Sequence, residues 1–438
     1  MPAKRVNIIS LGCSKNLVDA ERLMQMLGQA GCEVAFESDS PSDVTIVNTC
    51  GFIGDAKEES VNTILELCQA KAEGRIGEII VMGCLSERYR NTLTDEIPEI
   101  DRIYGKFDWP EIASYLARQS DRLPKTPANA TTAPGRHVTT GPSNAFIKIA
   151  EGCNRFCAFC AIPLITGRFK SRSIDDIVNE VTTLVADGYT EFNIIAQDLS
   201  SYGLDIYGSL SLARLIDRLA DIEGVHWLRL HYAYPAEFPH DILEVMRRRT
   251  NVCAYLDIAL QHASDKVLGN MRRHISRRET EELLDKIRRE VPGIHIRTTL
   301  MVGFPGEGEK EFDELLDFVK KQRFERMGAF AYCEEEDTFG ARNFTDDIPD
   351  DVKQQRLDRL MKVQEEISLE IQQQKVGTVV EVVIDSEEDD YYIGRTQWDS
   401  PEVDPQVLVE KTDTLIPGKY YNVRITEALP FELVGHIC

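Results

Sequence analysis

The sequence predicts an α/β chain of three parts: an N-terminal doubly wound parallel sheet, a central partial (βα)6 barrel and a C-terminal small antiparallel β-barrel. Short apolar segments alternate with amphipathic segments over residues 1–122, and the same rhythm returns over residues 144–374. Residues 375–438 contain short strand-like segments instead. A chain of 438 residues is long enough for several domains that each bury a core.

The N-terminal part is expected to form a parallel sheet, because short apolar strands are separated by helices. The expected strands are Val6–Ser10, Val44–Asn48 and Glu78–Met82. The expected helices are Leu17–Gln29 and Ala56–Ala72, and the second has its apolar positions at helical spacing. Ligands of such sheets bind at the carboxyl ends of the strands.

The stretch over residues 123–143 is rich in Pro, Thr and Ala and is predicted to be a linker between domains. After it we expect βα units, with helices such as Asp175–Asp187 and Arg278–Glu290. The expected strands are Phe146–Ala150, Phe192–Ala196, Trp227–His231, Tyr255–Leu260, Ile294–Met301 and Gly328–Tyr332. This pattern indicates an open, TIM-like barrel with ligands at the C-terminal ends of its strands.

A long charged helix, Asp350–Gln374, is expected to end the central part. Short strands follow at Val376–Ile384, Tyr391–Arg395 and Tyr420–Thr426. Short strands without intervening helices are typical of a small antiparallel β-barrel.

The composition argues against several classes of protein. The net charge of −23 disfavours broad affinity for nucleic acid or anionic membranes, since phosphate binding relies on clustered Lys and Arg. There is no apolar run of about 18 residues and no signal-peptide pattern at the start, so we expect no membrane association. Eleven cysteines in such a chain indicate a reducing cytoplasm and metal ligation, not disulfides.

One short run of cysteines predicts an iron–sulfur cluster with an open iron. Cys153, Cys157 and Cys160 form a C-x3-C-x2-C loop, which offers three thiolates to the four irons of a 4Fe–4S cluster. An open coordination position is typical of catalytic metal sites. The alternatives are a zinc loop or buried thiols, although common zinc spacings come in paired C-x2-C sets. The loop resembles the radical S-adenosylmethionine (SAM) superfamily, whose open iron chelates the amino and carboxylate groups of SAM.

A second set of cysteines is spread over the N-terminal part. Cys13, Cys50 and Cys84 each follow one of the predicted strands. Because the carboxyl ends of parallel strands meet at one edge of a sheet, the three thiols are expected to converge. They would again be three ligands for a 4Fe–4S cluster with an open iron. The alternative is that they are buried thiols that pack as small apolar groups.

The whole chain resembles the methylthiotransferase family. That family has an N-terminal three-cysteine α/β domain, a radical SAM barrel and a C-terminal TRAM domain. Two further segments match its patterns: Leu260-Gln-His-Ala-Ser-Asp-Lys-Val-Leu268 and Met301-Val-Gly-Phe-Pro-Gly-Glu307. The resemblance implies two 4Fe–4S clusters, SAM as methyl donor and radical source, and insertion of a methylthio group at an unreactive C–H bond. We assign no catalytic side chain, because such chemistry belongs to the cofactors.

Contacts to SAM are suggested by position. Phe159 could pack on the adenine, as the aromatic residue at this place does in radical SAM enzymes. Gln197 and Arg172 could bind the polar groups of SAM, with a surface or salt-bridged role as the alternative for each. Gly303, with Gly306, is expected to shape a turn near the adenosine.

Further polar residues are expected at the mouth of the barrel, where strands end. His231, Gln261 and His262 could contact substrate or be satisfied hydrogen-bonding residues. The sequence does not separate these roles.

The C-terminal part indicates the substrate class. Residues 375–438 contain five Lys or Arg and thirteen Asp or Glu, a net charge of −8. An acidic barrel would repel phosphate backbones and attract a Lys/Arg-rich protein. Segments 12–19 and 48–53 resemble the family branch that modifies a small-subunit ribosomal protein, more than the branch that modifies transfer RNA.

The hypothesis is therefore a methylthiotransferase that acts on the β-carbon of an aspartate in small-subunit ribosomal protein number twelve. Nucleic acid is not expected to be the direct substrate, and a reductant protein is expected to supply electrons. Two alternatives remain. One is a transfer-RNA adenosine methylthiotransferase, and the other is a non-catalytic RNA- or ribosome-binding protein whose clusters only hold the fold.

Overall fold

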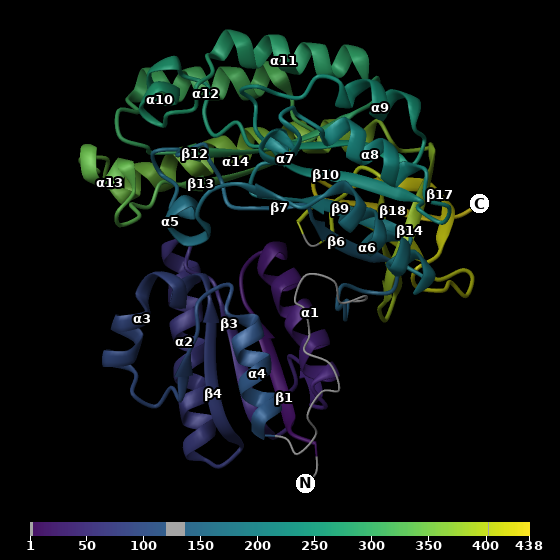
Figure 1. Cartoon of the computed structure of the whole chain (residues 1–438). Coiled ribbons are helices and arrows are strands. Elements are labelled where there is room, and N and C mark those ends of the chain that lie inside the picture. The colour runs from purple at the N-terminus through teal and green to yellow at the C-terminus, as the bar shows by residue number, and fades with distance from the viewer. Residues whose placement is uncertain (1–2, 120–135, 402) are drawn as a thin grey trace.

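The computed structural model describes residues 3–119, 136–401 and 403–438 (Figure 1). It confirms the expected order of a parallel-sheet domain, an open α/β barrel and a C-terminal β-barrel. Most of the linker predicted over residues 123–143 lies outside the described residues. Its last part, from residue 136, leads into the first barrel strand.

The N-terminal sheet has the strand order β2-β1-β3-β4-β5, and every pairing is parallel. Its strands are β1 (Arg5–Ser10), β2 (Glu33–Phe36), β3 (Ser42–Thr49), β4 (Ile76–Gly83) and β5 (Arg102–Ile103). Its helices are α1 (Ser14–Gln29), α2 (Gly54–Ala72), α3 (Cys84–Glu96) and α4 (Trp109–Gln119). Helices α1 and α4 pack on one face of the sheet, and α2 and α3 on the other (Figure 1). The sheet is thus doubly wound, as predicted, with β2 and β5 as additional edge strands.

The central sheet is a parallel six-stranded open barrel in the order β13-β12-β11-β10-β9-β6. Its strands are β6 (Asn144–Lys148), β9 (Glu191–Ile195), β10 (Trp227–Ala233), β11 (Val252–Ile258), β12 (His295–Val302) and β13 (Arg326–Ala331). The outer helices are α6 (Ile174–Ala186), α8 (Leu212–Ala220), α9 (Ile242–Arg248), α11 (Arg277–Glu290), α12 (Glu309–Gln322) and α14 (Asp350–Gln373). One continuous apolar core fills the space between sheet and helices.

Shorter elements lie around the mouth of this barrel. They are β7 (Ala150–Glu151), α5 (Ile162–Thr166), β8 (Lys170–Ser171), α7 (Leu204–Tyr207), α10 (Asp265–Asn270) and α13 (Phe339–Asn343). Helix α5 follows the cysteine loop and lies directly above α3 of the N-terminal domain in Figure 1. The two domains therefore meet at the carboxyl edges of both sheets.

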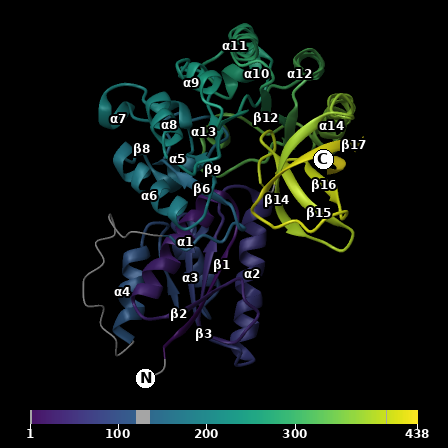
Figure 2. The same ribbon diagram turned by 90° about the vertical axis from the view of Figure 1, so that its right-hand side faces the viewer.

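The C-terminal domain is a closed barrel of strands in the order β14-β15-β16-β18-β17 (Figure 2). Its strands are β14 (Val379–Glu387), β15 (Tyr391–Thr396), β16 (Gln406–Glu410), β17 (Tyr420–Ala428) and β18 (Glu432–Ile437). The pairings are antiparallel, as predicted, except that β16 pairs with β18 in parallel. Strands β16 and β18 were not expected from the sequence.

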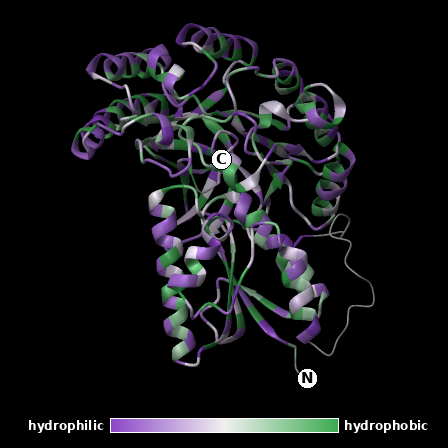
Figure 3. Cartoon of the chain, turned by 60° about the vertical axis from the view of Figure 1, so that its left-hand side comes forward, coloured by the Kyte–Doolittle hydropathy of each residue, from purple (hydrophilic) through white to green (hydrophobic). Residues whose placement is uncertain are grey.

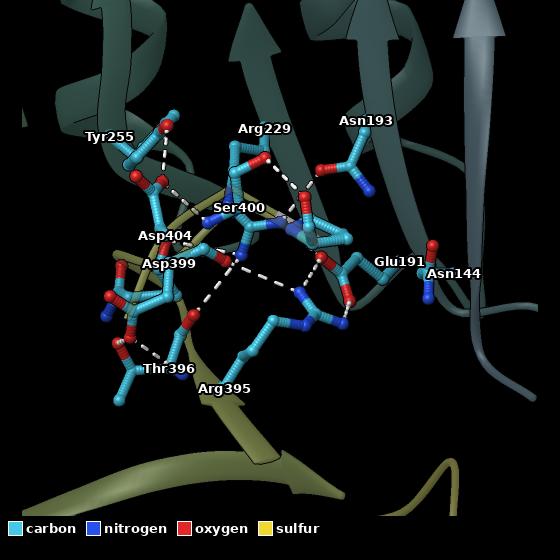
Figure 4. A network of polar contacts seen from close by, with 12 residues as sticks. Asn144, Glu191, Asn193, Arg229, Tyr255, Arg395, Thr396, Asp399, Ser400 and Asp404 are labelled. Atoms are coloured by element: carbon cyan, nitrogen blue, oxygen red, sulfur yellow. Dashed lines mark hydrogen bonds and ion pairs between the residues drawn. The ribbon is translucent and has the colours of Figure 1, made fainter. Parts of the chain in front are cut away.

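The segment after β15 reaches into the starting ends of the central strands (Figure 4). Glu191, the first residue of β9, binds Arg229 of β10 and Arg395 of β15, and the Arg395 contacts are 2.8 and 2.9 Å. Asp399 binds Arg326 at 2.5 Å, and Asp404 accepts a hydrogen bond from Tyr255 at 2.7 Å. These two acidic groups that follow β15 therefore face polar partners of the central barrel instead of solvent.

The outer helices are amphipathic. Figure 3 shows hydrophilic and hydrophobic residues interleaved along them, as expected for helices with one buried face. In the parts of the chain that the structure describes, no helix is both long and apolar enough to span a membrane.

Candidate active site

The three cysteines of the central loop lie between β7 and α5, at the carboxyl end of the first barrel strand. Cys153 and Cys157 are buried, and Cys160 is half-buried. Backbone hydrogen bonds fix the loop, from Cys153 to Gly167 at 3.2 Å and from Cys160 to Cys157 at 3.1 Å. Gly152 has a φ of +72°, and a Cβ atom there would overlap the Arg168 carbonyl, so this position requires glycine.

Burial and neighbouring sulfurs raise the pKa of two thiols in this loop. Burial raises the pKa of Cys153 to about 12, and the nearby charge of Asp198 and of Cys157 acts in the same direction. Burial also raises the pKa of Cys160, and the neighbouring Cys157 and Cys153 thiolates add to this effect. Burial therefore favours the neutral thiols, and a metal bound here would have to stabilise the thiolate forms, as metal ligation does.

The second trio also converges, as the sequence predicts. Cys13 directly precedes α1, Cys50 directly follows β3, and Cys84 begins α3 after β4. A Cβ atom on Gly12 would lie 2.8 Å from the Cys50 sulfur, and one on Gly51 would lie 2.8 Å from the Cys84 carbonyl carbon. The absence of side chains at these glycines lets the cysteine segments approach each other.

The three thiols of this trio differ in acidity. Burial acts to raise the pKa of Cys13 even though its side chain reaches solvent, but the charges of Lys15 and Lys106 outweigh burial and lower it. Burial raises the pKa of Cys50 to about 11, and the nearby Cys13 and Cys84 sulfurs contribute. Burial likewise raises the pKa of Cys84. The three sulfurs are thus close enough to influence one another.

Asn16 joins the strand ends around the second trio. Its Oδ1 atom accepts hydrogen bonds from the Cys84 thiol at 3.4 Å and from Lys106 at 3.0 Å. Its Nδ2 atom donates to the carbonyls of Leu11 and Thr49, each at 3.1 Å. Sequence reasoning missed Asn16 and Lys106, although Asn16 lies only three residues after Cys13 and could have been considered.

The two trios face each other across the domain boundary. Cys84 packs in a buried apolar cluster with Ala161 and Ile165, and Ala161 directly follows Cys160. Next to this contact, Asp19 binds Lys106 of its own domain at 3.0 Å and Lys148 of β6. Each of these three charged side chains is at most 2% exposed. The sequence did not predict this ionic contact.

The donor sets fit iron–sulfur clusters. Among the described residues, no three His, Cys, Asp or Glu side chains are grouped as ligands of one metal ion. A 4Fe–4S cluster does not need such a group, because each thiolate binds a different iron. Each trio would supply thiolates alone, the ligands that these clusters take, and would leave one iron without a cysteine ligand from the trio.

The residues expected to contact SAM lie in different environments. Phe159 is buried and packs edge-to-face on Phe304, with ring centroids 6.4 Å apart. Gln197 is half-buried at the carboxyl end of β9. Arg172 binds Asp176 at 2.7 Å and Glu180 at 2.6 Å, which is the salt-bridged alternative. Contact of any of them with SAM stays a prediction.

The expected turn at Gly303 is present. Gly303 has a φ of +76° and donates its N–H to Glu307 at 3.0 Å. Glu307 in turn binds His262 at 3.0 Å and Arg356 at 2.9 Å. His262 is therefore a satisfied hydrogen-bonding residue that fixes this turn, and proximity of the turn to the adenosine stays a prediction.

The other two residues at the mouth of the barrel differ in whether their polar groups have partners. His231 is buried and contacts the Asn193 side chain at 3.2 Å, and burial lowers its pKa well below the usual range. Gln261 has a φ of +73°, and its buried Oε1 atom has no hydrogen-bond partner among the described residues. That orphaned acceptor leaves Gln261 available to a bound molecule.

Comparison with known proteins identifies the family. Residues 5–105 match the family described as "Uncharacterized protein family UPF0004", residues 147–319 the radical SAM superfamily, and residues 376–438 the TRAM domain. A protein of Phocaeicola vulgatus named "Ribosomal protein uS12 methylthiotransferase RimO" is 54% identical over 439 residues, covering both chains completely. The chain belongs to the radical SAM methylthiotransferase family. A Porphyromonas gingivalis methylthiotransferase of the same name is also 54% identical over its full length.

The fold of this methylthiotransferase is shared more widely. The radical SAM methyltransferase TsrM from Kitasatospora setae, solved with tryptophan and a SAM analogue, has a TM-score of 0.57 and 15% identity. The alignment covers 88% of this chain and 79% of that one. The cobalamin-dependent enzyme OxsB aligns with a TM-score of 0.52 at 13% identity, over 83% of this chain and 56% of its own. These structures show a common fold.

Proposed function

We propose that this methylthiotransferase inserts a methylthio group at the β-carbon of an aspartate in small-subunit ribosomal protein uS12. The contact of Cys84 with Ala161 and Ile165 carries the proposal, because it sets the sulfur-holding trio against the radical-generating trio. The full-length relatives named for this activity support the choice of uS12 as the substrate.

The protein supplies two ligand sets and a closed environment. Cys153, Cys157 and Cys160 would hold the radical SAM cluster, and Cys13, Cys50 and Cys84 would hold the second cluster. When bound, the two 4Fe–4S clusters and SAM supply the electron, the radical and the methylthio sulfur. An apolar cluster that includes Phe159, Met301 and Phe304 packs beside Cys157 and excludes water from that side of the site.

Three features would hold SAM. Phe159 would pack on the adenine, Gln197 would bind a polar group of SAM, and the turn at Gly303 would border the adenosine. Arg172 is held by Asp176 and Glu180, which joins β8 to α6, and a contact of its guanidinium with a polar group of SAM stays a prediction.

The C-terminal barrel is proposed to dock the basic substrate protein. The hairpin between β14 and β15 exposes Glu387, Glu388, Asp389 and Asp390. Within the described part of the chain, only Glu387 of these four forms an ion pair, with Lys411 at 2.8 Å. Such a surface attracts a Lys/Arg-rich protein and repels phosphate backbones. Nucleic acid is therefore not the direct substrate, and the enzyme acts in the cytoplasm with a reductant protein as its second partner.

Mass spectrometry of uS12 from cells with and without this chain tests the function. We expect uS12 to carry a methylthio-aspartate only where the chain, or a copy supplied on a plasmid, is present. A Cys153→Ala copy should not restore the modification. An undiminished modification in cells that lack the chain would refute the proposal. Loss of methylthio-adenosine from transfer RNA, with uS12 unaffected, would favour the transfer-RNA alternative.

A further inference from the structure

A buried arginine contacts the central cysteine trio. Arg273 lies in the turn after α10 and is 2% exposed. Its Nη1 atom donates a hydrogen bond to the Cys157 sulfur at 3.1 Å, and its Nη2 atom donates to the Ala259 carbonyl. The guanidinium also lies over the Tyr234 ring, 4.1 Å from the centroid, and the Tyr234 hydroxyl donates to the Arg273 carbonyl at 2.8 Å. These contacts fix both the backbone and the side chain of Arg273.

Arg273 differs from the other buried arginines of the described chain. Each of the others forms an ion pair with a carboxylate: Arg136 with Glu21, Arg229 and Arg395 with Glu191, Arg326 with Asp399, and Arg356 with Glu307. Within residues 3–119, 136–401 and 403–438, Arg273 has no carboxylate partner, and its buried Nε atom has no hydrogen-bond partner.

A buried charge without a counter-charge is unfavourable, since desolvation of the guanidinium is not offset by an ion pair. The group within reach of Arg273 that can carry a negative charge is the sulfur of Cys157, as a thiolate ligand of a metal. Arg155 makes a useful contrast, because it also lies over the Tyr234 ring, at 4.3 Å, but is neutralised by Asp198 and Glu237 at 2.7 Å each. The site around Arg273 is therefore built to receive negative charge at the cysteine loop.

We propose that Arg273 is a positioning residue of the central cluster, which orients the Cys157 thiolate and raises the cluster's reduction potential. Charge, hydrogen bonds to sulfur and burial are the features through which a protein sets the potential of an iron–sulfur cluster. A fixed positive charge beside a ligand sulfur favours the reduced cluster, which carries one more electron. The proposal rests on the central cluster of the proposed function.

A redox titration followed by electron paramagnetic resonance tests this role without measuring turnover. The full-length chain would carry Cys13→Ala, Cys50→Ala and Cys84→Ala, so that only the central cluster gives a signal. In this background we expect Arg273→Gln to shift the midpoint potential to more negative values. Arg273→Lys, which keeps the charge, should lie between Arg273→Gln and the parent.

Arg272→Gln is the matched control. It removes the same charge from the neighbouring residue, whose guanidinium lies over the Phe339 ring at 4.6 Å instead of near sulfur. Its potential should equal that of the parent. A parental potential in Arg273→Gln, or an equal shift in Arg272→Gln, would overturn the proposal.

Iron content keeps the test decisive. If Arg273→Gln folds but binds no iron, the proposal requires that Arg273→Lys, with the same melting temperature, binds about four irons, the content of one 4Fe–4S cluster. Loss of iron from both variants would overturn it. If the parent, which lacks the second trio but keeps Arg273, bound no iron, the central cluster itself would be refuted. Failure of the proposed function is therefore distinguishable from failure of the role of Arg273.

Discussion

At the scale of the residue, glycines set how closely the cysteine segments approach. Gly12 has a φ of +88°, and a Cβ atom there would lie 2.7 Å from the Cys50 Cβ atom and 2.8 Å from its sulfur. Both atoms are closer than non-bonded contact allows, so the Cys50 side chain would have to move. The second trio therefore depends on a residue that binds nothing itself.

Gly12→Ala is expected to abolish the second cluster. The new methyl group displaces the Cys50 thiol, so iron per chain should fall from about eight to about four, one 4Fe–4S cluster fewer. Gly74→Ala is the matched control, because Gly74 has a similar φ of +74° with nothing within 4 Å of the added Cβ. Iron analysis of both variants checks this, and equal iron content in the two would contradict it.

The sequence predicted the cysteines better than their surroundings. That Cys13, Cys50 and Cys84 lie at neighbouring strand ends could be predicted because parallel strands end at one edge and each cysteine follows a strand, while their role as cluster ligands stays a prediction. Asn16 and Lys106 could not, since single polar residues have no spacing that marks a hydrogen bond across the domain. For Arg172 the sequence left a contact with SAM and a salt-bridged role open, and the structure shows ion pairs with Asp176 and Glu180.

At the scale of the element, the segment after β15 joins the C-terminal barrel to the central one. Glu191 lies between Arg229 and Arg395, and all three side chains are at most 3% exposed. Burial acts to raise the pKa of Glu191, but Arg395 and Arg229 outweigh it and hold the pKa at about 2. The carboxylate is thus stabilised by the fold across the ordinary pH range.

Glu191→Gln is expected to lower the free energy of unfolding by about 3–5 kcal/mol, because it leaves the buried Arg229 without its counter-charge and leaves Arg395 with Asp385 as its remaining one. The effect has a defined pH dependence, since the pKa of Glu191 is lower in the folded state. The difference from the parent should be complete above the unfolded pKa of about 4.3 and shrink as the pH falls toward the folded value. Denaturant unfolding at several pH values measures it.

Glu381→Gln is the matched control for this prediction. Glu381 pairs with His226 at 3.0 Å, but the two side chains are 45% and 40% exposed. An exposed pair contributes only about 0–1 kcal/mol, so this variant should unfold nearly as the parent does. An equally large effect in both variants would show that the buried network does not stabilise the joined barrels.

Elements with a strong pattern of apolar residues were predicted from the sequence, and the short edge strands were not. The central strands appear as apolar runs because both of their faces are buried. Strand β2, Glu33–Phe36, has four residues, alternates between exposed and half-buried positions, and pairs only with β1. Its register depends on the neighbouring strand, which a local pattern does not reveal.

At the scale of the whole molecule, net charge and domain contact together define the acidic surface that is proposed for docking. Sequence counting treated every acidic residue of the C-terminal part as surface. The structure corrects this for Asp399 and Asp404, whose side chains are 1% and 3% exposed and bind arginines of the central barrel. The hairpin at residues 387–390 stays exposed, so the acidic surface is smaller but still present.

Reversing the charge of the hairpin is expected to weaken substrate binding. With Glu388, Asp389 and Asp390 all changed to Lys, the KM for uS12 should rise about tenfold, if each lost contact is worth about 0.5 kcal/mol. The formation of 5′-deoxyadenosine without uS12 should not change, because the hairpin lies outside the ligand sets. Steady-state kinetics at two salt concentrations measure both quantities.

The control variant changes the same charge elsewhere. Asp95, Glu96 and Glu99 are exposed residues of the N-terminal domain, and changing all three to Lys alters the net charge equally. This variant should keep the parental KM. An equal rise of KM in the two variants would indicate a response to net charge and contradict docking through the hairpin.

Iron and acid-labile sulfide content of the anaerobically reconstituted chain tests the central claim most directly, namely that two facing cysteine trios hold two clusters. The parent should contain about eight irons, and Cys13→Ala and Cys157→Ala should each retain about four, the content of one 4Fe–4S cluster. A parent with about four irons, unchanged in Cys13→Ala, would reduce Cys13, Cys50 and Cys84 to buried thiols and contradict the account.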